Sequence, residues 1–264
     1  MRRRLALAAV FAAAAVAARA QPAQEKPAAL RDVGYDQRLG EQVPLDLAFR
    51  DEAGRSVTLR SLFRGRAVVL SLAYYECPML CTLTLNGLVS ALSILTFDVG
   101  KDFDVVTVSF EPKETAALAA AKKKAYLARY RRPGAEEGWH FLTGEAPAIA
   151  ALTSAVGFRY AWDAETRQYA HPAGILVLTP DGRIARYMYG VEYAPRDLRL
   201  ALVEASQRRI GNPVDTVLLY CYRYDPARGR YAASVIRLVR LGGVLTVLGL
   251  GAFVLLSLRR ERVA

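Results

Sequence analysis

Two kinds of hydrophobic spacing alternate along the middle of the chain. Short runs rich in Val, Leu and aromatic residues predict strands, and apolar residues repeated every three or four positions predict helices. The expected strands cover residues 43–49, 67–73, 103–110, 139–143 and 158–162, with a hairpin formed by 175–179 and 183–187. The expected helices cover residues 83–95, 115–130, 146–156 and 195–210. This alternation predicts an α/β fold class, and no internal repeat competes with it.

The order of these elements is that of a thioredoxin-like fold: strand, helix, strand, helix, then a hairpin and a closing helix. We expect this domain to occupy residues 39–210. Pro44 would confine the first strand to an edge of the sheet, because proline cannot donate to a strand ladder. The run Lys122-Lys123-Lys124 is expected to be a solvated helix face.

The first twenty residues have the three parts of a secretory signal peptide. Arg2-Arg3-Arg4 precedes an apolar run that ends in the small-residue exit Ala18-Arg19-Ala20. An uncleaved membrane anchor is the alternative, but the shortness of the run favours cleavage. Residues 21–38 follow as a linker rich in Pro, Ala and charge. The sequence therefore predicts an exported domain.

A second apolar stretch, residues 241–258, lies near the other end of the chain. Its eighteen uncharged residues stand between Arg240 and Arg259, and as a helix they would extend about 27 Å, enough to cross a bilayer core. We expect a C-terminal transmembrane helix, preceded by a juxtamembrane segment at 211–240 and followed by a cytoplasmic tail at 259–264. A buried core helix is the alternative. The expected location is a bacterial inner membrane, with the globular domain in the periplasm.

The net charge of +11 is concentrated in these two ends. The first twenty residues carry four Arg and no acid, and the residues after Ile236 carry five Arg against one Glu. The domain between them is nearly balanced and has no basic stripe interleaved with aromatic residues. The charge therefore indicates a membrane partner and excludes a nucleic-acid partner.

Cys77 and Cys81 stand where the strand 67–73 gives way to the next helix. If that helix begins near Pro78, the two thiols lie one turn apart on one face. A helix N-terminus favours thiolate over thiol, which suits a nucleophile or a ligand for a soft metal. A structural disulfide or two buried core thiols is the alternative interpretation.

His171 stands shortly before the strand predicted to begin at Ile175. If that strand runs antiparallel beside residues 67–73, His171 lies next to Cys77 and Cys81. Two thiolates and one imidazole in a solvent-facing loop are soft ligands suited to Cu(I), and they could also hold Cu(II). Zinc would usually require a fourth protein ligand. The other histidine, His140, is expected to be structural.

Cys221 is the third thiol of the chain, in the tyrosine-rich stretch 218–226. An odd cysteine in an oxidising compartment is unusual. It could serve as a redox partner or an extra ligand, although packing among the tyrosines as a small apolar residue is the favoured interpretation.

Four motifs together resemble the Sco/SenC family of copper-binding, thioredoxin-like proteins, over roughly residues 39–210. They are Arg64-Gly65-Arg66, Cys77-Pro78-Met79-Leu80-Cys81, Val108-Ser109-Phe110-Glu111-Pro112, and His171 ahead of Leu178-Thr179-Pro180-Asp181-Gly182. The resemblance implies that Cys77, Cys81 and His171 are copper ligands. It further implies that the protein assists assembly of cytochrome c oxidase, with subunit II and its dinuclear copper site as the partner.

The chain departs from the family pattern beside each predicted ligand. Met79 stands where an acidic residue often follows Cys-Pro, and Thr82 stands where a Pro often follows the second cysteine. Tyr169 replaces an acidic residue two positions before His171, so a carboxylate that orients the imidazole is not evident.

Two functions share the same residues. In the first, the protein is a membrane-anchored copper chaperone whose exposed site passes its ion to a partner's thiolates. In the second, it is a thiol-disulfide oxidoreductase in which Cys77 attacks a partner disulfide and Cys81 resolves the mixed disulfide, keeping the oxidase cysteines reduced. Metal binding should require His171, whereas dithiol exchange should largely survive its loss.

Overall fold

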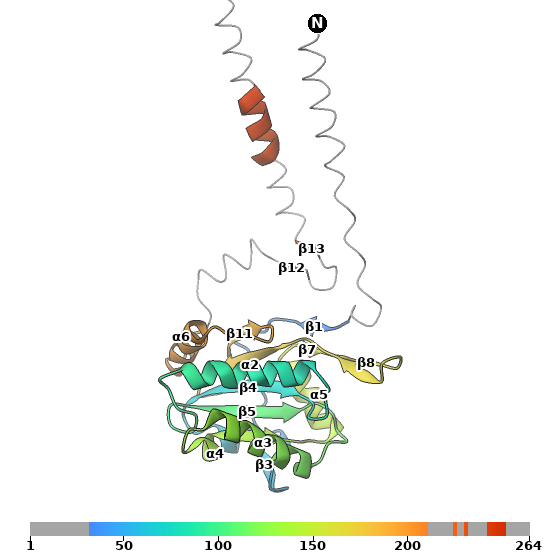
Figure 1. Ribbon diagram of the computed structural model, residues 1–264, viewed down its shortest axis with the longest axis vertical. Coiled ribbons are helices and arrows are strands. Elements are labelled where there is room, and N and C mark those ends of the chain that lie inside the picture. Colours follow the sequence, from blue (N-terminus) through green and yellow to red (C-terminus); the bar gives the residue numbers. More distant parts are fainter. Residues whose placement is uncertain (1–31, 211–223, 226–229, 232–241, 252–264) are drawn as a thin grey trace, which may run out of the picture. The chain divides into compact units, whose positions relative to one another are not determined.

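The structure is a computed structural model of the 264-residue chain, and it describes residues 32–210, 224–225, 230–231 and 242–251 (Figure 1). Residues 32–210 belong to one compact unit, and the other described residues belong to a second unit. The predicted signal peptide, Cys221, the cytoplasmic tail and most of the juxtamembrane segment lie outside the described residues.

A five-stranded mixed sheet forms the centre of the domain, in the order β11-β10-β4-β5-β6. The parallel strands β4, β5 and β6 lie side by side, and β10 runs antiparallel to both β4 and β11. Their bounds are Ala67–Ala73 (β4), Phe103–Ser109 (β5), Trp139–Leu142 (β6), Gly174–Leu178 (β10) and Ile184–Tyr189 (β11). This is the predicted thioredoxin-like architecture, and the antiparallel pairing that places His171 beside the cysteines is confirmed.

Three helices cover one face of this sheet. Connections between parallel strands through a helix are right-handed. The chain moves from β4 to β5 through α2 and from β5 to β6 through α3, in the same direction across the sheet. Helices α2 and α3 therefore lie on the same face (Figure 1). Helix α6 contacts α2 as well as β4, β10 and β11, and α5 contacts β7. The bounds are Leu80–Ile94 (α2), Ala116–Tyr130 (α3), Ala135–Gly138 (α4), Ala146–Ala155 (α5), Pro195–Ser206 (α6), and Leu59–Leu62 for the 3-10 helix η2.

Strands β4 and β5 are buried along their whole length. Central parallel strands are covered on both faces, which is why their sequences are continuous apolar runs rather than alternating ones. Bulky side chains such as Trp139, Phe103 and Phe141 fill the core around them. These strands hold the loops at their carboxyl ends, where the cysteines lie.

The short strands at the rim differ from the sequence prediction. Residues 43–49 were expected to form one strand, but β2 covers only Ala48–Arg50, where it pairs with β3 (Ser56–Thr58). The expected strand 158–162 is interrupted, giving β7 (Phe158–Arg159) and β8 (Ala161–Asp163). Strand β8 pairs with the unpredicted β9 (Gln168–Ala170), which leads directly to His171.

Ordered structure begins before residue 39, inside the predicted linker. Strand β1 (Gly34–Tyr35) pairs with β7. The Tyr35 ring is buried against Phe158 and Tyr187, and its hydroxyl donates to the Gly174 carbonyl. Because two residues cannot show a hydrophobic period, the sequence pattern did not predict this strand.

The expectation that Lys122-Lys123-Lys124 forms a solvated face is wrong for Lys123. Its side chain is 13% exposed, forms an ion pair with Glu52 and donates to the Glu136 carbonyl. A lysine buries its aliphatic stem readily when its ammonium group has partners.

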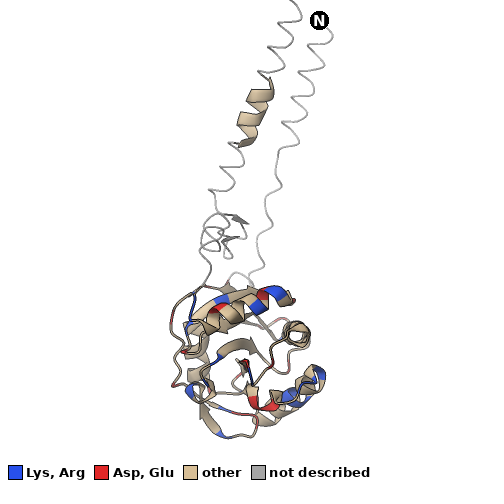
Figure 2. Cartoon of the chain, turned by 90° about the vertical axis from the view of Figure 1, so that its left-hand side faces the viewer, with Lys and Arg blue, Asp and Glu red and all other residues tan. Residues whose placement is uncertain are grey.

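Elsewhere, both signs of charge are distributed over the domain in the view of Figure 2, as expected for a nearly balanced surface.

His140 should make stability depend on pH. It lies on β6, its Nε2 is buried without a hydrogen-bond partner among the described residues, and burial lowers its pKa. The unfolded chain therefore binds a proton more readily than the native state, and native stability falls as the pH drops below about 6.5. We expect His140→Leu to flatten this decline in urea unfolding between about pH 7.5 and 5. Parallel pH profiles for the two proteins would contradict this assignment.

The C-terminal span was predicted at 241–258, and the structure describes residues 242–251 of it as helical. Among the residues that the structure describes, no helix is both long and apolar enough to cross a membrane. Residues 224–225 and 230–231 pair as two short antiparallel strands, β12 (Tyr224–Asp225) and β13 (Arg230–Tyr231).

Candidate metal centre

Helix α2 begins at Leu80, three residues before the predicted range 83–95 and two residues after Pro78, and this decides how the cysteines lie. Met79 is the N-cap and Leu80 the first helical residue, so Cys77 precedes the helix and Cys81 lies in its first turn. The Cys81 backbone N–H donates to the Cys77 sulfur at 3.2 Å. Cys77 thereby satisfies a backbone donor that a helix N-terminus leaves without an intrahelical partner.

The third predicted residue, His171, reaches the cysteines through the register of β10. Ile175 lies opposite Ser71 of β4, so the segment before β10 lies near the carboxyl end of β4. His171 Nε2 is 3.2 Å from Cys81 Sγ. The ligand atoms of Cys77, Cys81 and His171 all lie within 4.8 Å of one another. The structure therefore brings all three predicted site residues together.

The two thiols have opposite electrostatic environments. Hydrogen bonds from the Cys81 side chain and from the backbone N–H groups of Cys81 and Met79 lower the pKa of Cys77 well below its usual range, although burial opposes them. Burial, together with the neighbouring Cys77 sulfur, raises the pKa of Cys81. Of the two sulfurs, Cys77 is therefore the one that loses its proton more readily.

A backbone carbonyl orients the imidazole of His171, in place of the carboxylate that the sequence lacks. His171 Nδ1 lies 3.1 Å from the Pro172 carbonyl oxygen. Because a carbonyl only accepts hydrogen bonds, Nδ1 carries the proton and the Nε2 lone pair faces Cys81. Neutral imidazole with a free Nε2 is the form that binds metals.

The expectation that these residues lie in a solvent-facing loop is wrong. Cys77 and His171 are 7% exposed and Cys81 is 2% exposed. Aromatic rings cover the imidazole, with the Phe110 centroid at 5.4 Å and the Tyr74 centroid at 5.9 Å. Phe110 and Tyr74 follow β5 and β4, so their convergence depends on strand order and is not visible in the sequence.

Cys77 and Cys81 are free thiols, so the structure does not contain the disulfide that spacing left open. Two sulfurs and one imidazole nitrogen form a donor set that fits a soft metal ion. The assignment of all three as metal ligands remains a prediction. His140, expected to be structural, lies on β6 outside this group.

Sequence reasoning missed one polar residue beside this site. Glu114 lies in the turn after β5, is 7% exposed and accepts a hydrogen bond from the Glu76 backbone N–H at 2.8 Å. A Glu that follows Pro112 and precedes a helix is typical of a surface turn, so its sequence context gave no sign of burial.

Comparison with solved structures supports the fold. A candidate electron transfer protein from Aquifex aeolicus VF5 is 28% identical with a TM-score of 0.58, and the match covers 65% of this chain and 96% of that chain. Arabidopsis thaliana ScoI with copper bound is 18% identical with a TM-score of 0.50, covering 61% and 96%. BsSco, in which a disulfide switch was identified, belongs to the Sco family of cytochrome c oxidase assembly proteins; it is 20% identical with a TM-score of 0.50, covering 65% and 98%.

Comparison with curated proteins finds no sequence match. The sequence model of the SCO1/SenC family matches residues 36–205, which is more than half of the chain and includes both cysteines and His171. The chain belongs to the SCO1/SenC family.

Proposed function

We propose that this protein carries one copper ion on Cys77, Cys81 and His171 and assists assembly of cytochrome c oxidase. The approach of the three donor atoms to within 4.8 Å of one another is the observation that carries this proposal. Membership of the SCO1/SenC family supports it, because relatives in that family include a copper-bound ScoI and a cytochrome c oxidase assembly protein.

Each proposed ligand has a distinct task when copper enters. Cys77 would offer its sulfur as a thiolate, because the Cys81 side chain and the N–H groups at the start of α2 lower its pKa. Cys81 must lose its proton before its sulfur can bind, so metal binding releases a proton. His171 offers the Nε2 lone pair while Pro172 holds Nδ1–H. Copper is the cargo in this scheme, and the soft donor set fits Cu(I) and also accommodates Cu(II).

The proposed client is subunit II of the oxidase, whose dinuclear copper site would receive the ion. Met79 lies between the two cysteines and is 66% exposed, in contrast to the buried ligands. It is therefore a candidate contact for a partner. We further propose that the chain is exported and anchored by residues 241–258, with its globular domain in the periplasm.

A thiol-disulfide oxidoreductase is the second candidate function, favoured by the opposite pKa shifts of the two thiols. The Cys77 thiolate would attack a partner disulfide, forming a mixed disulfide and releasing one partner sulfur. Cys81 would then attack the Cys77 sulfur and release the other partner sulfur. The partner disulfide is reduced to two thiols, and Cys77 and Cys81 are oxidised to a disulfide.

His171→Ala separates the two functions. We expect it to weaken Cu(I) binding at least about tenfold, because one of three donors is lost, while exchange with a small disulfide continues. Cu(I) affinity is measured by competition with a chromogenic chelator, and exchange by release of a coloured thiol. His140→Leu is the matched control, since His140 is the chain's other histidine. Unchanged copper affinity in His171→Ala would overturn the proposed ligand set.

A further inference from the structure

Glu114 carries a buried carboxylate that the proposed copper ligation does not use. It lies between β5 and α3 and is 7% exposed. Removing a carboxylate from water costs free energy unless hydrogen-bond donors replace the water. Burial accordingly raises the pKa of Glu114. The hydrogen-bond donors to this carboxylate therefore show which parts of the fold it connects.

The two carboxylate oxygens of Glu114 bind different parts of the fold. Oε1 accepts from the Glu76 backbone N–H at 2.8 Å, and Oε2 accepts from the Ser109 hydroxyl at 2.5 Å. Ser109 is the last residue of β5, whereas Glu76 belongs to the loop after β4 and directly precedes Cys77. The carboxylate thus connects a rigid central strand to the loop that carries Cys77.

Cys77 needs such a connection because it precedes α2, so the backbone hydrogen bonds within the helix do not hold it. Its own N–H donates to the Tyr74 carbonyl at 3.2 Å, which closes only a local turn. The Tyr75 hydroxyl fixes the start of this loop by donating to the Leu142 carbonyl at 2.7 Å. Glu114 supplies the long-range contact at the residue adjacent to Cys77.

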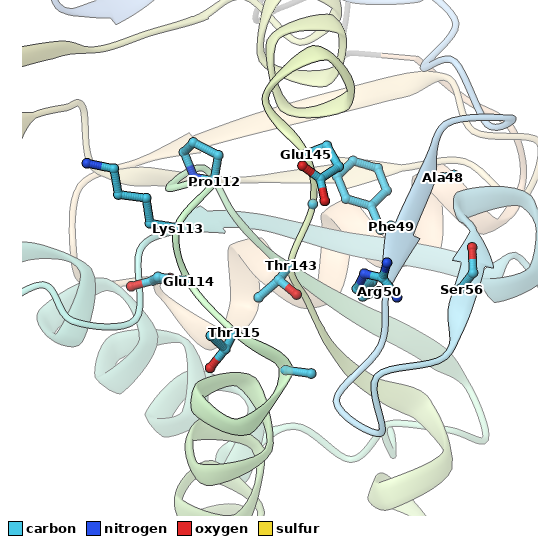
Figure 3. Close-up of a pocket in the computed structure, with 12 residues that line it drawn as sticks. Ala48, Phe49, Arg50, Ser56, Pro112, Lys113, Glu114, Thr115, Thr143 and Glu145 are labelled. Atoms are coloured by element: carbon cyan, nitrogen blue, oxygen red, sulfur yellow. The ribbon is translucent and has the colours of Figure 1, made fainter.

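Glu114 borders a cavity, and a closed backbone turn presents its side chain. It lines a cavity of about 430 Å³ together with Lys113, Thr115 and Thr143. Figure 3 shows its carboxylate turned away from Thr143. The Glu114 backbone N–H also donates to the Glu111 carbonyl at 3.2 Å, so the turn that presents the side chain is itself closed.

We propose that Glu114 is a positioning residue of the metal centre: by holding the Glu76 N–H, it keeps the Cys77 sulfur beside Cys81 and His171 before metal arrives. This inference rests on the proposed copper function and deepens it. A preorganised ligand loop binds more tightly, because less of the binding free energy is spent on ordering it. Residues that orient metal ligands from outside the coordination shell typically contribute about 10–100-fold in affinity.

Three substitutions in the full-length protein test this role through Cu(I) affinity. Glu114→Ala removes both acceptors, and we expect affinity to fall about tenfold or more. Glu114→Gln keeps an oxygen for the Glu76 N–H and an amide that can bond to Ser109, so its affinity should stay within about threefold of the parent. Glu114→Asp keeps the charge but is one methylene too short to bridge both partners, and its affinity should fall between the other two.

A matched control separates positioning from general stability. Asp51 is also buried, at 3% exposed, and accepts from the backbone N–H groups of Ala53 and Arg55 within the β2–β3 turn. Asp51→Ala should lower the melting temperature but leave copper affinity unchanged. Equal affinity in the parent and in folded Glu114→Ala would overturn the inference. If Glu114→Ala does not fold, Glu114→Asp takes its place, and a copper affinity equal to that of the parent would again overturn the inference. Absence of copper binding by the parent would instead refute the proposed function.

Discussion

Replacing Cys77 with Ser is expected to weaken copper binding by more than about a hundredfold, beyond the range typical of residues that only orient a ligand. Cys77 is the sulfur whose pKa is lowered, by the Cys81 side chain and by the N–H groups at the start of α2. A serine hydroxyl fits the same space but remains protonated and is a hard donor. Competition with a Cu(I) chelator under reducing conditions measures the loss.

Cys221→Ser is the control for this substitution. It removes the chain's third thiol, which lies outside the described residues, and the proposed ligand set predicts unchanged affinity. Comparable losses in both variants would show that Cys221 contributes a ligand. Retention of tight binding by Cys77→Ser would exclude Cys77 from the site.

Arg66→Met should cause the largest loss of stability among these substitutions, about 3 kcal/mol or more in the free energy of unfolding. Asp104 lies on β5 with a fully buried side chain, and both of its oxygens bond to the Arg66 guanidinium, at 2.8 and 3.1 Å. Removing Arg66 leaves a carboxylate in the core without its countercharge. Urea unfolding at neutral pH measures the effect.

The double variant Arg66→Met with Asp104→Asn should recover part of this loss, because the isolated buried charge is then absent. Arg64→Met is the matched control: Arg64 is an exposed arginine in the same segment, and its replacement should change stability by less than about 0.5 kcal/mol. Similar losses in both single variants would contradict a specific role for the Arg66–Asp104 pair.

The sheet and its helices were predictable because the hydrophobic pattern of each element extends over many residues. The run at Ala67–Ala73 became β4 with the same bounds, and the spacing at 115–130 became α3 with Thr115 as its N-cap. Pairing of β10 with β4 followed from the fold class, and it placed His171 beside the cysteines. The candidate site was therefore assembled from sequence with its three residues correctly grouped.

Other features depend on contacts between distant segments, which no local pattern encodes. The burial of His171 results from Tyr74 and Phe110, which meet only because β4 and β5 are adjacent. The role of Glu114 depends on Glu76, thirty-eight residues earlier. The exact start of α2 could not be read from the sequence: the apolar pattern begins at residue 83 and Pro78 is compatible with a first helical turn, whereas the helix begins at Leu80.

X-ray absorption spectroscopy of the copper-loaded, reduced protein tests the central claim most directly, because it counts sulfur and nitrogen ligands without relying on substitutions. The arrangement of Cys77, Cys81 and His171 predicts one copper per chain with two sulfur ligands and one nitrogen ligand. A third sulfur would show that Cys221 or Met79 completes the site. A copper environment of only oxygen and nitrogen, or the absence of stoichiometric copper, would contradict the proposed metal centre.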